Sequence, residues 1–180
     1  MQEVRKFLVT NGEEVTLRPA LPADAGGIII SLRSTSLERS YVLMEQYGRD
    51  AESEREYISR IERSHNLLIV ATVRGEVVGT LAAFQADRGQ RAETAHVLFV
   101  GLHLIESSRG LGIGSQMLEY SIEWAAEHGF KKLEASIFTT NKRSLHVFSK
   151  AGFVQECTKL KKFRIGHDYI DEVCMGKLLD

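Results

Sequence analysis

LHLIESSRGLGIGSQML, residues 102–118, joins an apolar strand pattern to an amphipathic helix pattern through a turn rich in glycine. Gly110, Gly112 and Gly114 occupy alternate positions directly after Arg109. This G-x-G-x-G spacing differs from the G-x-G-x-x-G fingerprint of dinucleotide-binding folds. It also lacks the lysine that ends a nucleoside-triphosphate P-loop. Neither nucleotide motif therefore explains the turn.

The glycine-rich turn nevertheless predicts an anion site. The first N–H groups of a helix have no intrahelical acceptor, and they lie at the positive end of the helix dipole. Glycine allows an anion to approach the backbone without obstruction by Cβ, and Ser115 could add a hydroxyl. We expect a phosphate or pyrophosphate here; the alternative is that the glycines only turn the chain.

The flanks of the turn predict a β-α-β unit. Residues 93–106 are rich in Val, Leu and Phe, as in a buried strand, and Gly101 within them marks a bulge or a close backbone approach. Residues 113–129 carry apolar side chains at helical spacing, and Gly129 is expected to end the helix. A further strand pattern at residues 130–140 should run parallel to the first.

The other segments surround this unit with alternating strand and helix patterns. In chain order they are a strand at 13–20, helices at 21–38 and 52–65, two strands at 66–85, a short helix at 141–153 and two strands at 154–179. The strands at 66–85 should form an antiparallel meander with the central strand. The sequence predicts a single α/β (α+β) domain over residues 1–180, with a mixed, mostly antiparallel sheet and helices on both faces.

Composition excludes several functional classes. The formal net charge of −1 argues against a broad basic surface for nucleic acid. No apolar run approaches the ~20 residues that span a bilayer, and charges interrupt the N-terminal apolar run, so we expect a cytoplasmic protein without a signal peptide. Cys157 and Cys174 lie far apart in the sequence, outside any metal-ligand spacing. We expect each to pack as a small apolar residue rather than to join a disulfide.

Two segments resemble the GNAT superfamily of acyl-CoA-dependent N-acetyltransferases. The pattern Arg/Gln-x-x-Gly-x-Gly/Ala of its acyl-CoA motif is filled by Arg109, Gly112 and Gly114. The next family signature, an Asn and then a helix ending in Lys-x-Gly-Phe, is similar to NKRSLHVFSKAGF at residues 141–153. Residues 91–104 and 166–179 are similar to the branch of ribosomal-protein and small-amine acetyltransferases.

The resemblance implies a GNAT-like domain that binds acetyl-CoA. Its central parallel unit should be splayed at a bulge at Gly101, which would open a slot for the pantetheine arm. Asn141 should bond near the pantetheine or the departing thiol, although it could also cap a helix. The residues implied in cofactor binding are Leu102, His103, Leu104, Arg109, Gly110, Leu111, Gly112, Ile113, Gly114, Ser115, Asn141 and Phe148.

The sequence identifies candidate groups for proton transfer, but it defines them less sharply than the residues for cofactor binding. His96 lies where family members often carry a base, and the alternative is a packed or partly exposed strand histidine. Phe148 occupies the position where many members place an acidic Tyr, so another group or water must protonate the thiolate. Tyr169 is a candidate general acid by residue type and position, whereas Tyr120 is expected on a helix surface.

The acceptor pocket should form from the first two helices, their link and the final strands. Glu38, Tyr41, Glu45 and Asp171 could attract a cationic amine there, or they could belong to a solvated face.

The favoured function is transfer of an acetyl group from acetyl-CoA to a primary amine by direct attack in a ternary complex. The amine could belong to a small amine, an amino acid or a protein N-terminus. The alternative, motivated by Phe148, is a non-catalytic acyl-CoA-binding regulatory module. We expect no metal, no nucleic acid and no membrane partner, and a homodimer is compatible with an exposed edge near the C-terminal strands.

Overall fold

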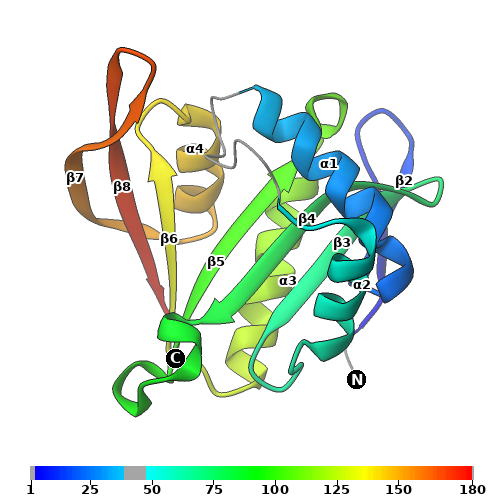
Figure 1. Cartoon of the computed structure of the whole chain (residues 1–180), viewed down its shortest axis with the longest axis horizontal. Coiled ribbons are helices and arrows are strands. Elements are labelled where there is room, and N and C mark those ends of the chain that lie inside the picture. The colour runs from blue at the N-terminus through cyan, green and yellow to red at the C-terminus, as the bar shows by residue number, and fades with distance from the viewer. Residues whose placement is uncertain (1–2, 39–47, 180) are drawn as a thin grey trace.

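One eight-stranded sheet, in the order β1-β2-β3-β4-β5-β6-β8-β7, organises the molecule (Figure 1). The structure is a computed structural model that describes residues 3–38 and 48–179. The strands are β1 (Arg5–Leu8), β2 (Glu14–Pro19), β3 (Leu67–Val73), β4 (Glu76–Gln85), β5 (Val97–Leu104), β6 (Lys132–Phe138), β7 (Val154–Ile165) and β8 (Asp168–Leu178). The helices are α1 (Ala25–Leu37), α2 (Ala51–Arg60), α3 (Ile113–Glu127) and α4 (Lys142–Lys150).

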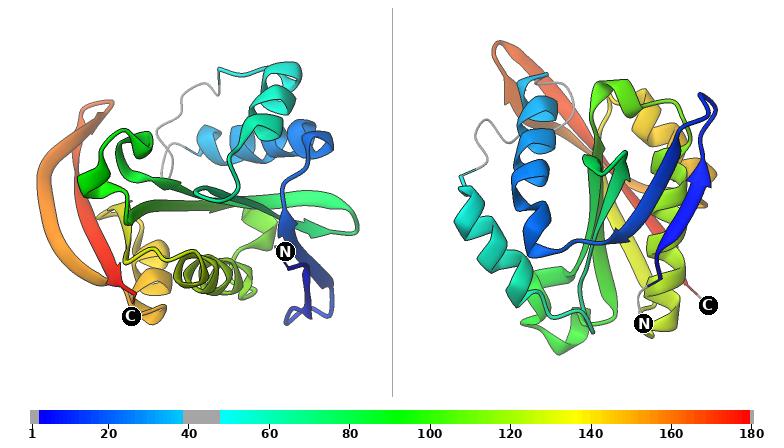
Figure 2. Two further views of the ribbon diagram at one scale, coloured as in Figure 1. Left: turned by 90° about the horizontal axis from the view of Figure 1, so that it is seen from below. Right: turned by 90° about the vertical axis from the view of Figure 1, so that its right-hand side faces the viewer.

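The helices lie in two layers, one on each face of the sheet (Figure 2). Figure 2 shows α1 and α2 on one face and α3 and α4 on the other. Met117 and Leu118 of α3 belong to the main core, whereas Ile28 of α1 and Ile58 of α2 belong to a second core with Val70 of β3. Among the described helices, none combines the length and the apolar character needed to cross a bilayer.

The predicted fold class is confirmed, with one strand more than the sequence patterns indicated. Strand β1 pairs with β2 in antiparallel register, from Arg5 opposite Leu17 to Leu8 opposite Glu14. It escaped the sequence analysis because it is only four residues long and is interrupted by charged side chains. The expected hairpin between β3 and β4 turns at Arg74 and Gly75, whose φ angles of 51° and 85° are typical of a type I′ turn.

Strand β5 separates from its parallel neighbour halfway along its length. It pairs with β6 only from Val97 to Phe99, whereas its pairing with β4 continues to Leu104. The predicted splay is therefore present. Gly101 pairs with Ala82 in unbroken register between residues 79–85 and 98–104, so the expected bulge at this glycine is not seen against β4. A Cβ at Gly101 would meet nothing within 4 Å, which leaves open space at the start of the splay.

The two cysteines do not pack as predicted. Both thiols are free, but Cys157 is exposed and Cys174 is only partly buried. For Cys157 the reason is that β7 is the outer strand of the sheet, so its side chains have a neighbouring strand on one side only. Cys157 and Cys174 are far apart in the sequence but directly opposite each other in the β7–β8 hairpin.

Candidate active site

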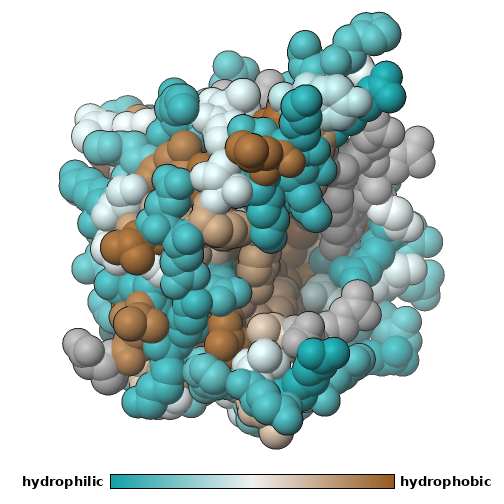
Figure 3. Space-filling view, turned by 90° about the vertical axis from the view of Figure 1, so that its left-hand side faces the viewer, coloured by the Kyte–Doolittle hydropathy of each residue, from teal (hydrophilic) through white to brown (hydrophobic). Residues whose placement is uncertain are grey.

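A cavity of about 800 Å³ occupies the splay and extends over the face of the sheet toward α1 and α2. Its lining comes from the turn before α3, the strands β3, β4, β5 and β6, and the helices α1, α2 and α4 with the residues directly before α2 and α4. Figure 3 shows a hollow with an apolar floor between hydrophilic rims on the side of the molecule toward β7 and α4. The cavity therefore brings together segments that are far apart in the sequence.

The turn before α3 has the backbone of an anion cradle. Gly110 and Gly112 have φ angles of 79° and 88°, which L side chains rarely adopt. Helix α3 begins at Ile113 with no side-chain cap, and its first backbone bond runs from the Gln116 N–H to the Gly112 carbonyl at 3.2 Å. Its first N–H groups thus remain available to a ligand. Gly110, Gly112, Gly114 and Ser115, for which the sequence predicts a phosphate site, line the cavity.

Two residues of the predicted cofactor set turn their side chains into the protein. Ile113 is buried in the main core, and Leu111 packs against that core. Any contribution from these positions to an anion site would come from their backbone. Leu102, His103 and Leu104 of β5 do line the cavity.

The Arg109 side chain connects the turn to α1. Its two terminal nitrogens lie 2.6 Å from the two carboxylate oxygens of Glu38, and its Nε donates to the Leu104 carbonyl at 2.8 Å. This bidentate pairing lowers the pKa of the Glu38 carboxyl. Arg109 therefore joins the C-terminal end of α1 to the end of β5, and Glu38 is already engaged by a cation rather than awaiting an amine.

Of the other predicted acceptor-side groups, the structure describes Asp171 alone. Asp171 accepts a hydrogen bond from the Lys161 N–H at 2.6 Å and does not line the cavity. Tyr41 and Glu45 lie outside the described residues.

His103 is a neutral, buried side chain in the cavity wall. Its Nε2 lies 3.0 Å from Ser31 Oγ of α1, and its Nδ1 lies 3.1 Å from Thr80 Oγ1 of β4. Ser31 Oγ also donates to the Ile28 carbonyl, so it accepts from Nε2–H, and Nδ1 accepts from Thr80. Burial lowers the pKa of His103 to about 4, and the Arg109 charge acts in the same direction. The sequence analysis assigned this residue a role only through its backbone.

Asn141 and Phe148 meet the cavity from α4. Asn141 Oδ1 accepts from the Ser144 N–H at 3.0 Å, so the residue caps the helix as the alternative interpretation predicted. The Phe148 ring is buried and packs edge-on against Phe153, with their centroids 5.0 Å apart. A phenyl ring at this position has no proton to donate to a thiolate.

The predicted proton-transfer residues lie away from the cavity. His96 is exposed before the first residue of β5, and its carbonyl accepts from the N–H groups of Lys131 and Lys132. Tyr169 is 58% exposed in the β7–β8 hairpin, with the Lys161 ammonium 5.6 Å from its ring centroid. Neither is among the described residues that line the cavity, because His96 precedes the splayed half of β5 and Tyr169 lies next to the hairpin turn.

Tyr120 was expected on the surface of α3, and this expectation is wrong. It is buried, and its hydroxyl donates to the Glu3 carbonyl at 2.8 Å. The N-terminal segment covers this side of α3, a contact that helical periodicity alone could not indicate.

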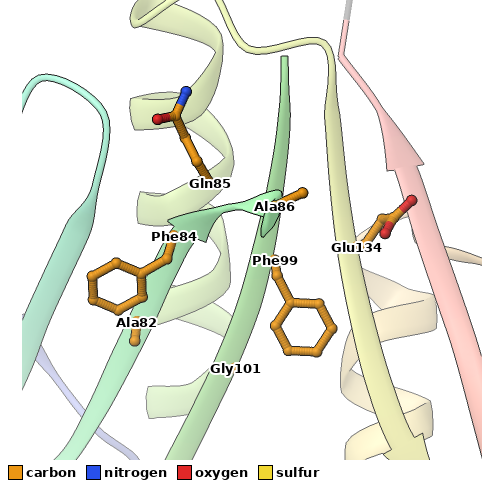
Figure 4. Close-up of a pocket in the computed structure, with 7 residues that line it drawn as sticks. All are labelled: Ala82, Phe84, Gln85, Ala86, Phe99, Gly101 and Glu134. Atoms are coloured by element: carbon orange, nitrogen blue, oxygen red, sulfur yellow. The ribbon is translucent and has the colours of Figure 1, made fainter. Parts of the chain in front are cut away.

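A row of side chains on adjacent strands forms an aromatic wall that the sequence analysis missed. Phe84 of β4 is opposite Phe99 of β5, and Phe99 is opposite Glu134 of β6. Figure 4 shows these side chains around a second, smaller cavity of about 460 Å³, with Gly101 beside them. Phe99 is 46% exposed, which is unusual for a large apolar side chain in the middle of a sheet. The signal in the sequence was the two-residue alternation, which places residues 99, 101 and 103 on one face.

Helix α2 completes this wall with an aromatic ring and an ion pair. The Tyr57 ring lies 6.3 Å from Phe84 between centroids, and the Arg49 guanidinium lies 3.7 Å from the Tyr57 centroid. Arg49 also pairs with the buried carboxylate of Glu54 at 3.2 Å. All four residues line the larger cavity, so this end of it has aromatic surface, and the charges of Arg49 and Glu54 there are paired with each other.

Comparison with known proteins assigns the family. Residues 34–153 match the model of the acetyltransferase (GNAT) family. The chain belongs to this family. YwnH of Bacillus subtilis (strain 168), provisionally named a phosphinothricin acetyltransferase, is 30% identical over 143 residues, which cover 78% of this chain and 85% of the relative. The prediction of an acetyl-CoA-dependent GNAT acetyltransferase is therefore confirmed.

Solved structures of GNAT proteins share the fold. A GNAT acetyltransferase from Streptococcus pneumoniae superposes with a TM-score of 0.86 at 25% identity, covering 92% of this chain and 99% of that chain. A phosphinothricin acetyltransferase from Sinorhizobium meliloti, solved in complex with acetyl-CoA, superposes with a TM-score of 0.81 at 22% identity, covering 92% and 88%. The GNAT fold thus extends over nearly the whole chain.

Proposed function

We propose that residues 1–180 act as one acyl-CoA N-acyltransferase domain, which moves an acetyl group from acetyl-CoA to a primary amine by direct attack in a ternary complex. The observation that carries the proposal is one continuous cavity, lined at one end by the glycine turn before α3 and at the other by side chains of α1, α2 and β4. Such a cavity has room for a phosphate-bearing donor and an acceptor together. Direct transfer then needs no acetylated intermediate on the chain.

The donor would bind mainly through backbone groups. N–H groups of residues 110–115 suit the pyrophosphate, because two of the glycines adopt left-handed φ angles and α3 has no side-chain cap. Beyond Phe99, β5 no longer pairs with β6, so residues 102–104 can bond to the pantetheine arm as to an added strand. Arg143 and Lys150 of α4 also line the cavity, and their positive charges suit the remaining phosphate of coenzyme A.

Acetyl-CoA supplies an activated thioester, and the chain would orient it and move protons. A backbone N–H near Leu104 is suited to polarise the thioester carbonyl. The amine proton has two candidate acceptors. His96, the predicted base, would have to act through water, whereas Glu134 lines the smaller cavity beside Phe99 and Gly101.

The departing thiolate would take its proton from water. Phe148 offers none, and Tyr169 lies outside the cavity wall. This route is not prohibitive, because a thiol has a reference pKa of ~8.5 and a thiolate is therefore a tolerable leaving group near neutral pH.

The acceptor end favours a small amine that carries an apolar part. Tyr57, Phe84 and Phe99 supply aromatic surface, and the nearby charges of Arg49 and Glu54 are paired with each other. Two similar proteins are named phosphinothricin acetyltransferases, which supports a small-molecule acceptor over a protein N-terminus. The choice between a small amine, an amino acid and a protein N-terminus, and with it the ribosomal-protein branch, stays a prediction.

Incubation of the chain with acetyl-CoA and a panel of primary amines tests the function. We expect release of free coenzyme A together with an acetylated amine identified by mass spectrometry, after subtraction of the chain's own two thiols. Thermal stabilisation by acetyl-CoA without turnover of any amine would instead support the non-catalytic acyl-CoA-binding module. Absence of both stabilisation and turnover would contradict donor binding itself.

Two variants then separate the candidate bases. If Glu134 accepts the proton, Glu134→Gln should lower kcat and remove the acidic limb of the pH–rate profile, while His96→Ala keeps the wild-type profile. The reverse pattern would assign the role to His96.

We also propose that β7 can mediate a homodimer, since it is the outer strand of the sheet and its far edge has no neighbouring strand in the described chain. Sedimentation at several protein concentrations tests this, and a concentration-independent monomer would contradict it.

A further inference from the structure

The β7–β8 hairpin brings the two cysteines of the chain to one position. Cys157 of β7 and Cys174 of β8 are direct partners in the antiparallel register. Directly opposite residues of an antiparallel pair point their side chains to the same face, with Cα atoms ~4.5–5.5 Å apart. A disulfide needs Cα atoms about 4.4–6.8 Å apart, so these cysteines can be bridged without moving the backbone.

The two thiols differ in their exposure, and an oxidant in solution reaches Cys157 first. Cys157 is exposed, so a small oxidant can reach it, and Cys174 is partly buried behind it. Burial raises the pKa of the Cys174 thiol, and its contact with Cys157 acts in the same direction. The ammonium of Lys159, which pairs with Glu172 at 2.9 Å, also lies near Cys174 and offsets part of this rise. Neither cysteine is among the described residues that line the two cavities, so the proposed acetyl transfer gives the pair no role.

The hairpin register is irregular around the pair. Shifts occur between Gln155 and Cys157 on one side and between Lys159 and Phe163 on the other. Cys157, Thr158 and Lys159 therefore form a short paired stretch between two irregularities. Every residue from Val154 to Lys162 on this strand is exposed, so burial contributes little to fixing its register. A covalent bond at Cys157 would fix it.

We propose that Cys157 and Cys174 form a reversible intramolecular disulfide in exchange with low-molecular-weight disulfides, which makes the hairpin an oxidation site independent of the acetyl-transfer cavity. The Cys157 thiolate attacks one sulfur of the small disulfide, forms a mixed disulfide and releases one small thiolate. The Cys174 thiolate then attacks Cys157 Sγ and releases the second. The two cysteines lose two protons and two electrons in total, and the small disulfide is reduced to two thiols.

The bond should stabilise the protein measurably. It closes a loop over residues 157–174, and chain-entropy arguments predict that a cross-link around a loop of this size stabilises the folded state, because it restricts the unfolded chain. For a chain of this length the expected rise in Tm is on the order of 5–10 °C. Dithiothreitol should reverse it.

The test equilibrates the whole chain with oxidised glutathione and compares it with the reduced protein by thiol titration, intact mass and thermal unfolding. The chain contains only these two cysteines, so the thiol count is unambiguous. We expect wild type to lose both thiols and two hydrogen atoms, to carry no glutathione and to melt at a higher temperature. Cys174→Ser should instead hold one glutathione on Cys157 and show no rise in Tm.

Two outcomes would overturn the proposal. One is wild type with a stable glutathione adduct on Cys157 and a free thiol at Cys174. The other is loss of thiols only through disulfides between chains, seen as a dimer on a non-reducing gel. Because the readouts are thiols, mass and Tm, they do not depend on whether the chain acetylates amines.

Discussion

The two ends of the main cavity differ in whether backbone or side chains form their walls. The end at α3 consists largely of backbone, in which Gly110 and Gly112 adopt left-handed φ angles before an uncapped helix. The end at α1 and α2 consists of side chains, including Tyr57, Phe84 and the buried His103. Backbone amides can recognise a phosphate whatever side chains surround them, whereas side chains determine which acceptor fits. Under the proposed function, the backbone end would be a generic donor site and the side-chain end a particular acceptor site.

The link between the two ends is the pair formed by Arg109 and Glu38. Arg109 follows β5 and immediately precedes the glycine turn, whereas Glu38 lies at the C-terminal end of α1. The carboxylate and guanidinium meet through two hydrogen bonds of 2.6 Å, a geometry that fixes orientation as well as distance. A substitution at one end can therefore change the geometry of the other end. Variants can measure this coupling through KM for acetyl-CoA and KM for the amine.

His103 should make the side-chain end sensitive to acid. Its pKa is lowered to about 4 in the folded protein, against 6.5 for a free imidazole, so the unfolded chain binds the proton first as the pH falls. The free energy of unfolding should therefore fall by up to about 3 kcal/mol between pH 6.5 and pH 4, and level off below. Urea unfolding over this range measures it. His103→Gln should flatten the curve, whereas the exposed control His167→Gln should not; parallel curves for wild type and His103→Gln would refute the assignment.

Gly112→Ala should weaken binding of acetyl-CoA at the glycine turn before α3. A Cβ at φ 88° strains the turn and stands where an anion approaches, so we expect KM for acetyl-CoA to rise about tenfold or more. The control is Gly75→Ala, which places the same strain at φ 85° in the β3–β4 turn, away from the cavity. Steady-state kinetics with both substrates distinguishes the two. Equal effects of both variants on KM would mean that strain, and not the cradle, is responsible.

Glu38→Gln should show how strongly the two ends are coupled. Loss of the carboxylate leaves Arg109 without its bidentate partner, and we expect KM for acetyl-CoA and for the amine to rise together, each about threefold. Glu56→Gln, in an exposed ion pair on α2, is the matched control and should change neither constant. A rise in only one of the two constants would show that the ion pair serves one end alone.

Tyr169→Phe should have the smallest effect, within about twofold on kcat, because the ring is 58% exposed and lies outside both cavities. The measurement is kcat at saturating acetyl-CoA over a range of pH. A loss of tenfold or more, confined to the limb where a general acid acts, would restore Tyr169 as the proton donor and would extend the acceptor end to the C-terminal hairpin.

The sequence predicted the backbone end well because its determinants are local. Glycine spacing, the strand before it and the helix after it lie within residues 97–127, so periodicity and turn chemistry were sufficient. The splay of β5 from β6 also followed from the resemblance. The aromatic wall was missed because Tyr57, Phe84 and Phe99 come from three elements and meet only across strand pairs and a helix packed on the sheet.

By itself the sequence determined the order of strands and helices from β2 onward, the parallel unit, the glycine-rich turn before α3 and the absence of a hydroxyl at Phe148. Each of these depends on residue type and on spacing along the chain. Only the tertiary structure decided that Arg109 pairs with Glu38, that His103 is neutral, that His96 and Tyr169 lie outside the cavity, and that Cys157 meets Cys174. These depend on strand register and helix packing, which bring together residues far apart in the sequence.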